Sequence, residues 1–175
     1  VDEAFARKMR DLGYSDLSDD TLVSMKIHGV TPEFVKALRE AGLTGASADD
    51  LIAFRIHEVT PDFVEGMAAL DLDDLSPDKL IAMRIHHVTP QFAQEMIEAG
   101  LEGLTYDDLV AFLIHKVTPE LAREAVALGF QDVTPGQLLA MAIHGVTPEF
   151  IKTAVEAGPE GITIDEIVSA KIQGR

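Results

Sequence analysis

Ile27-His28-Gly29-Val30-Thr31-Pro32-Glu33-Phe34 is a stretch that the chain repeats, and its repetition decides the fold. It returns as Ile56-His57-Glu58-Val59-Thr60-Pro61-Asp62-Phe63, and further copies begin at Ile85, Ile114 and Ile143. The histidines of successive copies are 29 residues apart, and Gln173 occupies the sixth place. Self-similarity at a fixed period of this size is typical of stacked-repeat proteins.

The repeat extends over the whole chain of 175 residues, so we expect one repeat domain over residues 1–175. Its segments are 1–17, 18–46, 47–75, 76–104, 105–133, 134–162 and 163–175. Leucine and alanine alternate at one position of successive copies (Leu12, Ala41, Leu70, Ala99, Leu128 and Ala157), which favours three double repeats of 58 residues as an alternative. The start and the end inside a unit are typical of a segment of a longer protein or of a designed repeat.

Each copy carries start signals for two short helices. In the second complete copy, Ser47 and Asp50 have the spacing of a capping box, which predicts a first helix (helix A) ending near His57. Thr60 and the proline after it predict a second helix (helix B) that runs to about Leu70. The expected caps are Ser18, Ser47, Ser76, Thr105, Thr134 and Thr163 for helix A, and Thr31, Thr60, Thr89, Thr118 and Thr147 for helix B.

Helix B also has a stop signal in most copies. A glycine stands where a left-handed residue would end the helix. These glycines are Gly13, Gly42, Gly100, Gly129 and Gly158, and Asp71 takes their place in one copy. The sequence therefore predicts an all-α fold, an α-solenoid of six helix-turn-helix repeats of 29 residues, curved or superhelical.

Helices of about ten residues are marginal alone in water, so packing must hold them. We expect the core to come from recurrent apolar positions, with small residues between them in helix A. In helix A these are Leu22, Leu51, Leu80, Leu109, Leu138 and Ile167, and five residues later Ile27, Ile56, Ile85, Ile114, Ile143 and Ile172. In helix B they are Phe5, Phe34, Phe63, Phe92, Leu121 and Phe150.

Composition excludes several classes of function. The formal charge of −16 opposes a general role in binding DNA or RNA, which needs a basic surface. The absence of cysteine excludes disulfides and thiolate chemistry. No stretch is apolar over the length needed to span a bilayer, so we expect no direct membrane insertion of this segment.

The octapeptide, with the Ala-Gly-Leu that ends helix B, resembles a short bacterial repeat. Similar copies follow the membrane-embedded metallopeptidase domain of proteins like the beta-lactam-sensor family. The resemblance implies a helical domain for interaction or sensing, located outside the cytoplasm, in a bacterial membrane-associated protein. The zinc motif His-Glu-x-x-His of such peptidases is absent, because Pro61 follows His57-Glu58 where the second histidine would stand.

The histidine row allows two interpretations. Imidazole is a common metal ligand, so His28, His57, His86, His115 and His144 are candidates for a metal- or ligand-sensing row. However, neighbouring helices lie about 8–10 Å apart, whereas two ligand atoms of one zinc lie within about 4 Å of each other. We therefore favour a structural role, in which each imidazole bonds a nearby carbonyl or threonine at the end of helix A.

The best candidate for a binding surface is a row of cations. Four copies have a cation directly before the isoleucine of Ile-His, or of Ile-Gln in the last copy: Lys26, Arg55, Arg84 and Lys171. A fifth copy has Lys116 one helical turn after that position. The position three residues later, which we expect on the same helical face, holds Gly29, Glu58, His87, Lys116, Gly145 and Gly174. Stacking would align the cations to receive an acidic peptide or an anionic ligand. The alternative is that each cation complements the negative end of its own helix A.

Paired acids such as Asp49-Asp50 recur in first helical turns, where they favour the helix dipole rather than catalysis. We therefore expect no enzymatic activity and no cofactor. The favoured function is a scaffold that binds a protein or a peptide. The alternatives are a small-ligand or metal sensor that uses the histidine row, and a structural or designed repeat with no partner.

Overall fold

The computed structural model describes residues 3–101 and 103–174, and every regular element there is helical. Helix A of successive copies forms α2 (Asp19–Ile27), α4 (Ala48–Ile56), α6 (Pro77–Ile85), α8 (Tyr106–His115), α10 (Pro135–Ile143) and α12 (Ile164–Ile172). Helix B forms α1 (Glu3–Asp11), α3 (Pro32–Glu40), α5 (Pro61–Ala68), α7 (Pro90–Glu98), α9 (Pro119–Ala127) and α11 (Pro148–Ala157). The predicted all-α repeat fold is therefore confirmed, although α5 ends two residues before Leu70.

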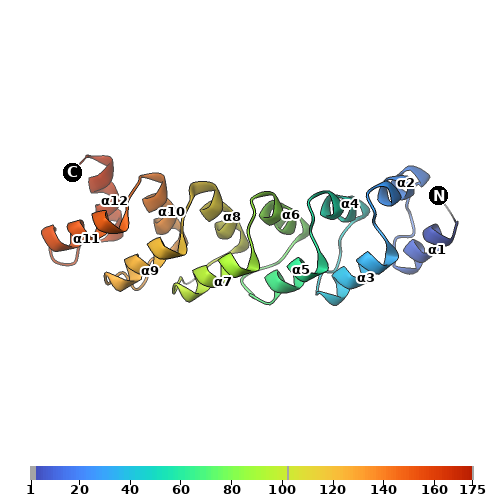
Figure 1. Ribbon diagram of the computed structural model, residues 1–175, viewed down its shortest axis with the longest axis horizontal. Coiled ribbons are helices and arrows are strands. Elements are labelled where there is room, and N and C mark those ends of the chain that lie inside the picture. The colour runs from blue at the N-terminus through green and yellow to red at the C-terminus, as the bar shows by residue number, and fades with distance from the viewer. Residues whose placement is uncertain (1–2, 102, 175) are drawn as a thin grey trace. The chain divides into compact units, whose positions relative to one another are not determined.

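The chain forms two compact units, one up to Ile85 and one from His86 onward. In the first unit α4 packs against α2 and α6, while α3 packs against α1 and α5. In the second unit α10 packs against α8 and α12, while α9 packs against α7 and α11. Each unit is thus two layers, a row of A helices and a row of B helices, in which each helix contacts its equivalent in the next copy (Figure 1).

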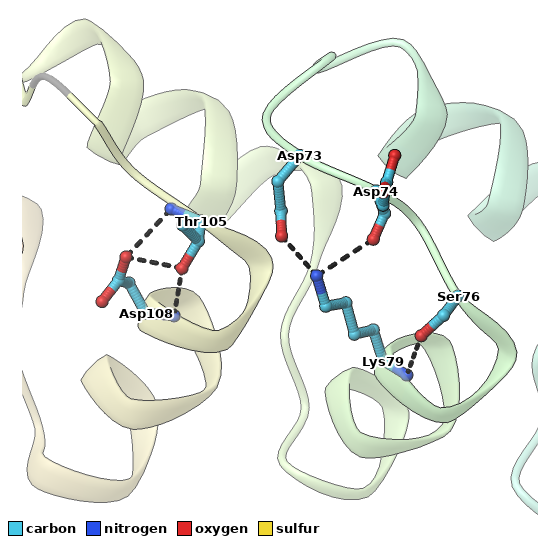
Figure 2. Close-up of polar contacts among 6 residues, drawn as sticks. All are labelled: Asp73, Asp74, Ser76, Lys79, Thr105 and Asp108. Atoms are coloured by element: carbon cyan, nitrogen blue, oxygen red, sulfur yellow. Dashed lines mark hydrogen bonds and ion pairs between the residues drawn. The ribbon is translucent and has the colours of Figure 1, made fainter.

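Hydroxyl caps begin the helices as predicted. The Ser47 hydroxyl accepts a hydrogen bond from the backbone N–H of Asp50, whose carboxylate accepts the N–H of Ser47 in return. Figure 2 shows the same reciprocal pair at Thr105 and Asp108. Replacing such a cap by alanine typically costs about 1 kcal/mol.

The third copy departs from this pattern, because Lys79 stands where Asp50 and Asp108 complete their capping boxes. Its backbone N–H still donates to the Ser76 hydroxyl. Its ammonium instead turns to the Asp73 carboxylate and the Asp74 carbonyl (Figure 2). The two acceptors place negative charge beside a cation that would otherwise oppose the positive end of the α6 dipole.

Schellman turns end α2, α8 and α10. After α2, the N–H of Val30 donates to the Met25 carbonyl at 2.8 Å, and the N–H of Gly29 donates to the Lys26 carbonyl at 3.1 Å. The residue before the valine is left-handed, with φ of +58° at Glu58, +60° at His87 and +59° at Lys116. These side chains therefore extend from a turn and do not continue the helical face, which corrects the sequence-based expectation.

Helix B ends on a left-handed residue in most copies, as predicted. Gly13, Gly42, Gly100 and Gly129 have φ between +88° and +105°, and Asp71 has φ of +48°. Gly158 differs, because its φ of −84° and ψ of −179° are extended. The physical reason is Pro159, since a residue before proline is restricted to extended conformations.

The core of each unit lies between its two layers. In helix A it is formed by the predicted leucine and by the residue three positions later, so that Leu51 and Phe54 are both fully buried. The valine that follows each of the first five A helices is buried as well, at Val30, Val59, Val88, Val117 and Val146. The six isoleucines expected to share this core are instead exposed, and that expectation is wrong.

Candidate functional site

A row of exposed isoleucines runs along the A helices of each unit. Ile27, Ile56 and Ile85 form the isoleucine row of the first unit, and Ile114, Ile143 and Ile172 form that of the second. Each side chain is between 48% and 75% exposed, and each occupies the last or next-to-last residue of its helix. These six are the exposed large apolar residues of the A helices together with Val23.

The geometry of the helix explains why these isoleucines point outward. An α-helix turns about 100° per residue, so Ile56 lies about 140° from Leu51 and about 200° from Phe54. Because Leu51 and Phe54 face the core, Ile56 must face solvent on the opposite side. The residue four positions earlier, Ile52, lies on the same side and is half-buried. The outer face of α4 therefore carries two isoleucines one turn apart.

The predicted cations lie next to these isoleucines and contact the preceding copy. The Arg55 guanidinium carbon lies 5.0 Å from the centroid of the Phe34 ring, and Nε of Arg55 donates to the His28 carbonyl at 3.4 Å. Arg84 repeats both contacts, at 5.1 Å from the Phe63 ring and 3.4 Å from the His57 carbonyl. Because His28 and His57 are C-terminal caps, each arginine complements the negative end of the preceding A helix.

The lysines of the row make the cation–π contact too. The Lys26 ammonium lies 5.4 Å from the centroid of the Phe5 ring, and the Lys171 ammonium lies 4.7 Å from that of Phe150. Such contacts contribute about 0.5–1 kcal/mol each at exposed sites. In the two copies without a cation, Leu113 and Ala142 stand at its position. Lys116 lies in the left-handed turn after α8 and is exposed.

Arg55 and Arg84 differ in their charge partners. Nη2 of Arg84 lies 3.4 Å from the Glu58 carboxylate, which extends from the left-handed turn after α4. The equivalent turn residue beside Arg55 is Gly29, where a Cβ would lie 3.2 Å from the Arg55 Nη2. In residues 3–101 and 103–174, no carboxylate forms an ion pair with Arg55. Arg55 is thus held in place by Phe34 and His28 with most of its N–H donors still available.

The B layer of the first unit contains a related contact. The Arg39 guanidinium lies 5.8 Å from the Tyr14 ring and donates to the Leu12 carbonyl at the end of α1. The Tyr14 hydroxyl donates to the Ala46 carbonyl at 2.8 Å. Burial raises the pKa of Tyr14, and the charge of Arg39 opposes this effect only in part. A cation that stacks on an aromatic ring of the preceding copy is therefore used in both layers.

The histidines occupy the predicted place at the end of helix A, but their side chains face solvent. His28, His115 and His144 are exposed, and His57 and His86 are half-buried. The expected hydrogen bond from each imidazole to a carbonyl or threonine is not seen in the described part of the chain. Within the same residues, no group of three or more histidine, aspartate or glutamate side chains is placed to hold a metal ion.

No protein-family model matches the chain, and no curated protein matches it either. None of the helices in residues 3–101 and 103–174 combines the length and the apolar character needed to cross a bilayer.

Proposed function

We propose that the protein is a non-enzymatic scaffold that binds a protein or peptide on the outer face of its A helices. The observation that carries this proposal is the isoleucine row, because a large β-branched side chain stands half-exposed at the same position of every copy. Repeat proteins bind through such extended rows, since each copy presents the equivalent position to the same side.

Burial of this row would supply the free energy of binding. Removing apolar surface from water contributes about 25 cal/mol per Å², and full burial of one isoleucine contributes about 1.5–3 kcal/mol. Ile27, Ile56 and Ile85 follow one another on packed helices of a single unit, so one partner reaches all three. Contiguous apolar surface of this kind is a recurrent feature of interaction sites.

The cations beside the row favour an acidic partner. Lys26, Arg55 and Arg84 each precede one isoleucine of the first unit, although the chain as a whole carries a formal charge of −16. A local basic edge within an acidic protein attracts acidic groups at short range, and salt screens this attraction. The same net charge disfavours nucleic acid as the partner.

We expect the double variant Ile56→Ser/Ile85→Ser to lose peptide binding while it keeps its fold. The probe is a phage-displayed library of random decapeptides, selected on the wild-type chain and then measured as labelled synthetic peptides by fluorescence anisotropy. Because each isoleucine is already about half-buried in the free protein, its loss removes about half of that contribution, and the two losses together lower the affinity by about 10- to 150-fold. Because both side chains are about half-exposed, the melting temperature should hardly change.

The matched control is Lys36→Ser/Glu65→Ser, which changes two exposed residues of α3 and α5 in the B layer of the same unit. It should bind the selected peptides as the wild type does. The proposal fails if no peptide is enriched over the empty support, or if enriched peptides bind the double isoleucine variant with unchanged affinity.

A further inference from the structure

We infer that the isoleucine row of the first unit takes an extended acidic peptide, with an apolar residue at every third position and a carboxylate that reaches Arg55. This inference rests on the proposed function and specifies its partner. It commits to a short linear segment of another protein and not to a folded surface. The spacing of the row and the unequal charge partners of Arg55 and Arg84 carry it.

The spacing of the row selects the conformation of the peptide. Ile27, Ile56 and Ile85 lie on α2, α4 and α6, which pack in sequence, and helices packed side by side lie about 8–10 Å apart. An extended chain in the polyproline II conformation advances about 3.1 Å per residue and has three residues per turn, so every third side chain returns to the same side after about 9 Å. Three apolar residues separated by two others therefore meet the three isoleucines in turn.

The charges select an acidic residue beside the central apolar anchor. Arg55 precedes the central isoleucine, Ile56, in α4, and its Nε donates to the carbonyl of His28, the residue after Ile27. No carboxylate of the described residues pairs with Arg55. Stacking on Phe34 and the bond to His28 already fix its guanidinium, so little conformational freedom is lost when a carboxylate binds. A guanidinium and a carboxylate form charge-assisted bonds stronger than neutral ones.

Glu58 makes the neighbouring cation less available. Its carboxylate lies 3.4 Å from Nη2 of Arg84, where a carboxylate of the peptide would otherwise bind. Glu58 also adds a negative charge of its own beside the row. The residue is left-handed at φ of +58°, a conformation that glycine adopts without strain. Glu58→Gly therefore removes the competing carboxylate without disturbing the turn.

The test uses the selected decapeptides in pairs, each acidic peptide being compared with its version in which aspartate and glutamate are replaced by asparagine and glutamine. We expect the amide version to bind wild-type protein about three- to tenfold more weakly, and the acidic version to weaken as salt rises from about 0.05 to 0.5 M. Glu58→Gly should tighten binding of the acidic version about threefold or more and leave the amide version nearly unchanged.

The matched control is Lys116→Gly. It relieves the same left-handed strain in the equivalent turn of the second unit but leaves the charges of the first unit intact. It should not change the affinity.

The acidic partner is wrong if acidic and amide peptides bind equally, or if Glu58→Gly has no more effect than Lys116→Gly. In either case the proposed function stands as long as binding still requires Ile56 and Ile85. If binding does not require these isoleucines, the proposed function itself fails. Enriched peptides with apolar residues at helical spacing, three or four apart and then seven, would overturn the extended conformation.

Discussion

Phe54→Ala should lower the free energy of unfolding by about 3–5 kcal/mol, whereas Ile56→Ala should change it by less than about 0.5 kcal/mol. The two residues are separated by one position in α4, yet Phe54 is fully buried and Ile56 is 54% exposed. Removing the ring leaves a cavity in close-packed surroundings. Removing the outward isoleucine leaves no cavity, and alanine is the better helix former.

Urea unfolding followed by circular dichroism measures both values on the same chain. Leu51→Ala serves as the control, because it removes a second core residue of the same helix and should also cost several kcal/mol. Equal losses from Phe54→Ala and Ile56→Ala would contradict the orientation of α4, and with it the assignment of the isoleucine row to the surface.

Arg84→Ala should cost about 2 kcal/mol, which makes it the largest stability effect that we expect from an exposed or half-buried charge in this chain. The substitution removes the cation–π contact with Phe63, the bond to the His57 carbonyl and the ion pair with Glu58. Together these three contacts contribute more to the free energy of unfolding than an ordinary surface ion pair, which contributes about 0–1 kcal/mol. The ion pair alone is salt-sensitive, so most of the loss should persist at high salt.

A double-mutant cycle isolates the contact between ring and cation. Combining Phe63→Leu with Arg84→Ala reproduces the pair Leu121 and Ala142 that the fourth and fifth copies already carry at the equivalent positions. We expect a coupling free energy of about 0.5–2 kcal/mol between the two sites. Strictly additive losses would show that Arg84 acts only through backbone and carboxylate, and that the ring contributes nothing to its role.

The start signals were predictable from sequence because they are local. A capping box lies within one helical turn, because it consists of a hydroxyl, the backbone N–H three residues later and the acid of that later residue. Its spacing alone therefore identifies the cap at Ser47. The end of helix B was predictable for the same reason, except at Gly158, where the proline after it restricts the backbone. Glycine at 29, 145 and 174 was a signal that the equivalent Glu58, His87 and Lys116 would be left-handed.

The core is predictable only in part because recurrence of an apolar residue does not by itself indicate burial. A residue that recurs in every copy can face either side of its helix, and the angle around the axis decides which. Ile56 follows Leu51 by five residues, which places it on the far side, whereas Phe54 follows by three and shares the buried side. The buried valine after each of the first five A helices, such as Val59, was missed although it stands in the quoted octapeptide.

The partners of the cations could not be predicted from sequence because they depend on packing. Arg55 contacts residues 21 and 27 positions earlier, and only the stacking of copies brings these groups together. Since these cations also join one copy to the next, substituting them changes stability as well as surface charge. Substituting the isoleucines tests binding with less effect on stability, because these side chains are exposed and contribute little to the core.

The most direct measurement of the central claim is the isoleucine methyl spectrum of the chain with and without a selected acidic peptide. We predict that binding shifts the Cδ1 methyl signals of Ile27, Ile56 and Ile85, while those of the buried Ile151 and Ile167 stay in place. A peptide that binds while the three row signals remain unchanged would contradict the account.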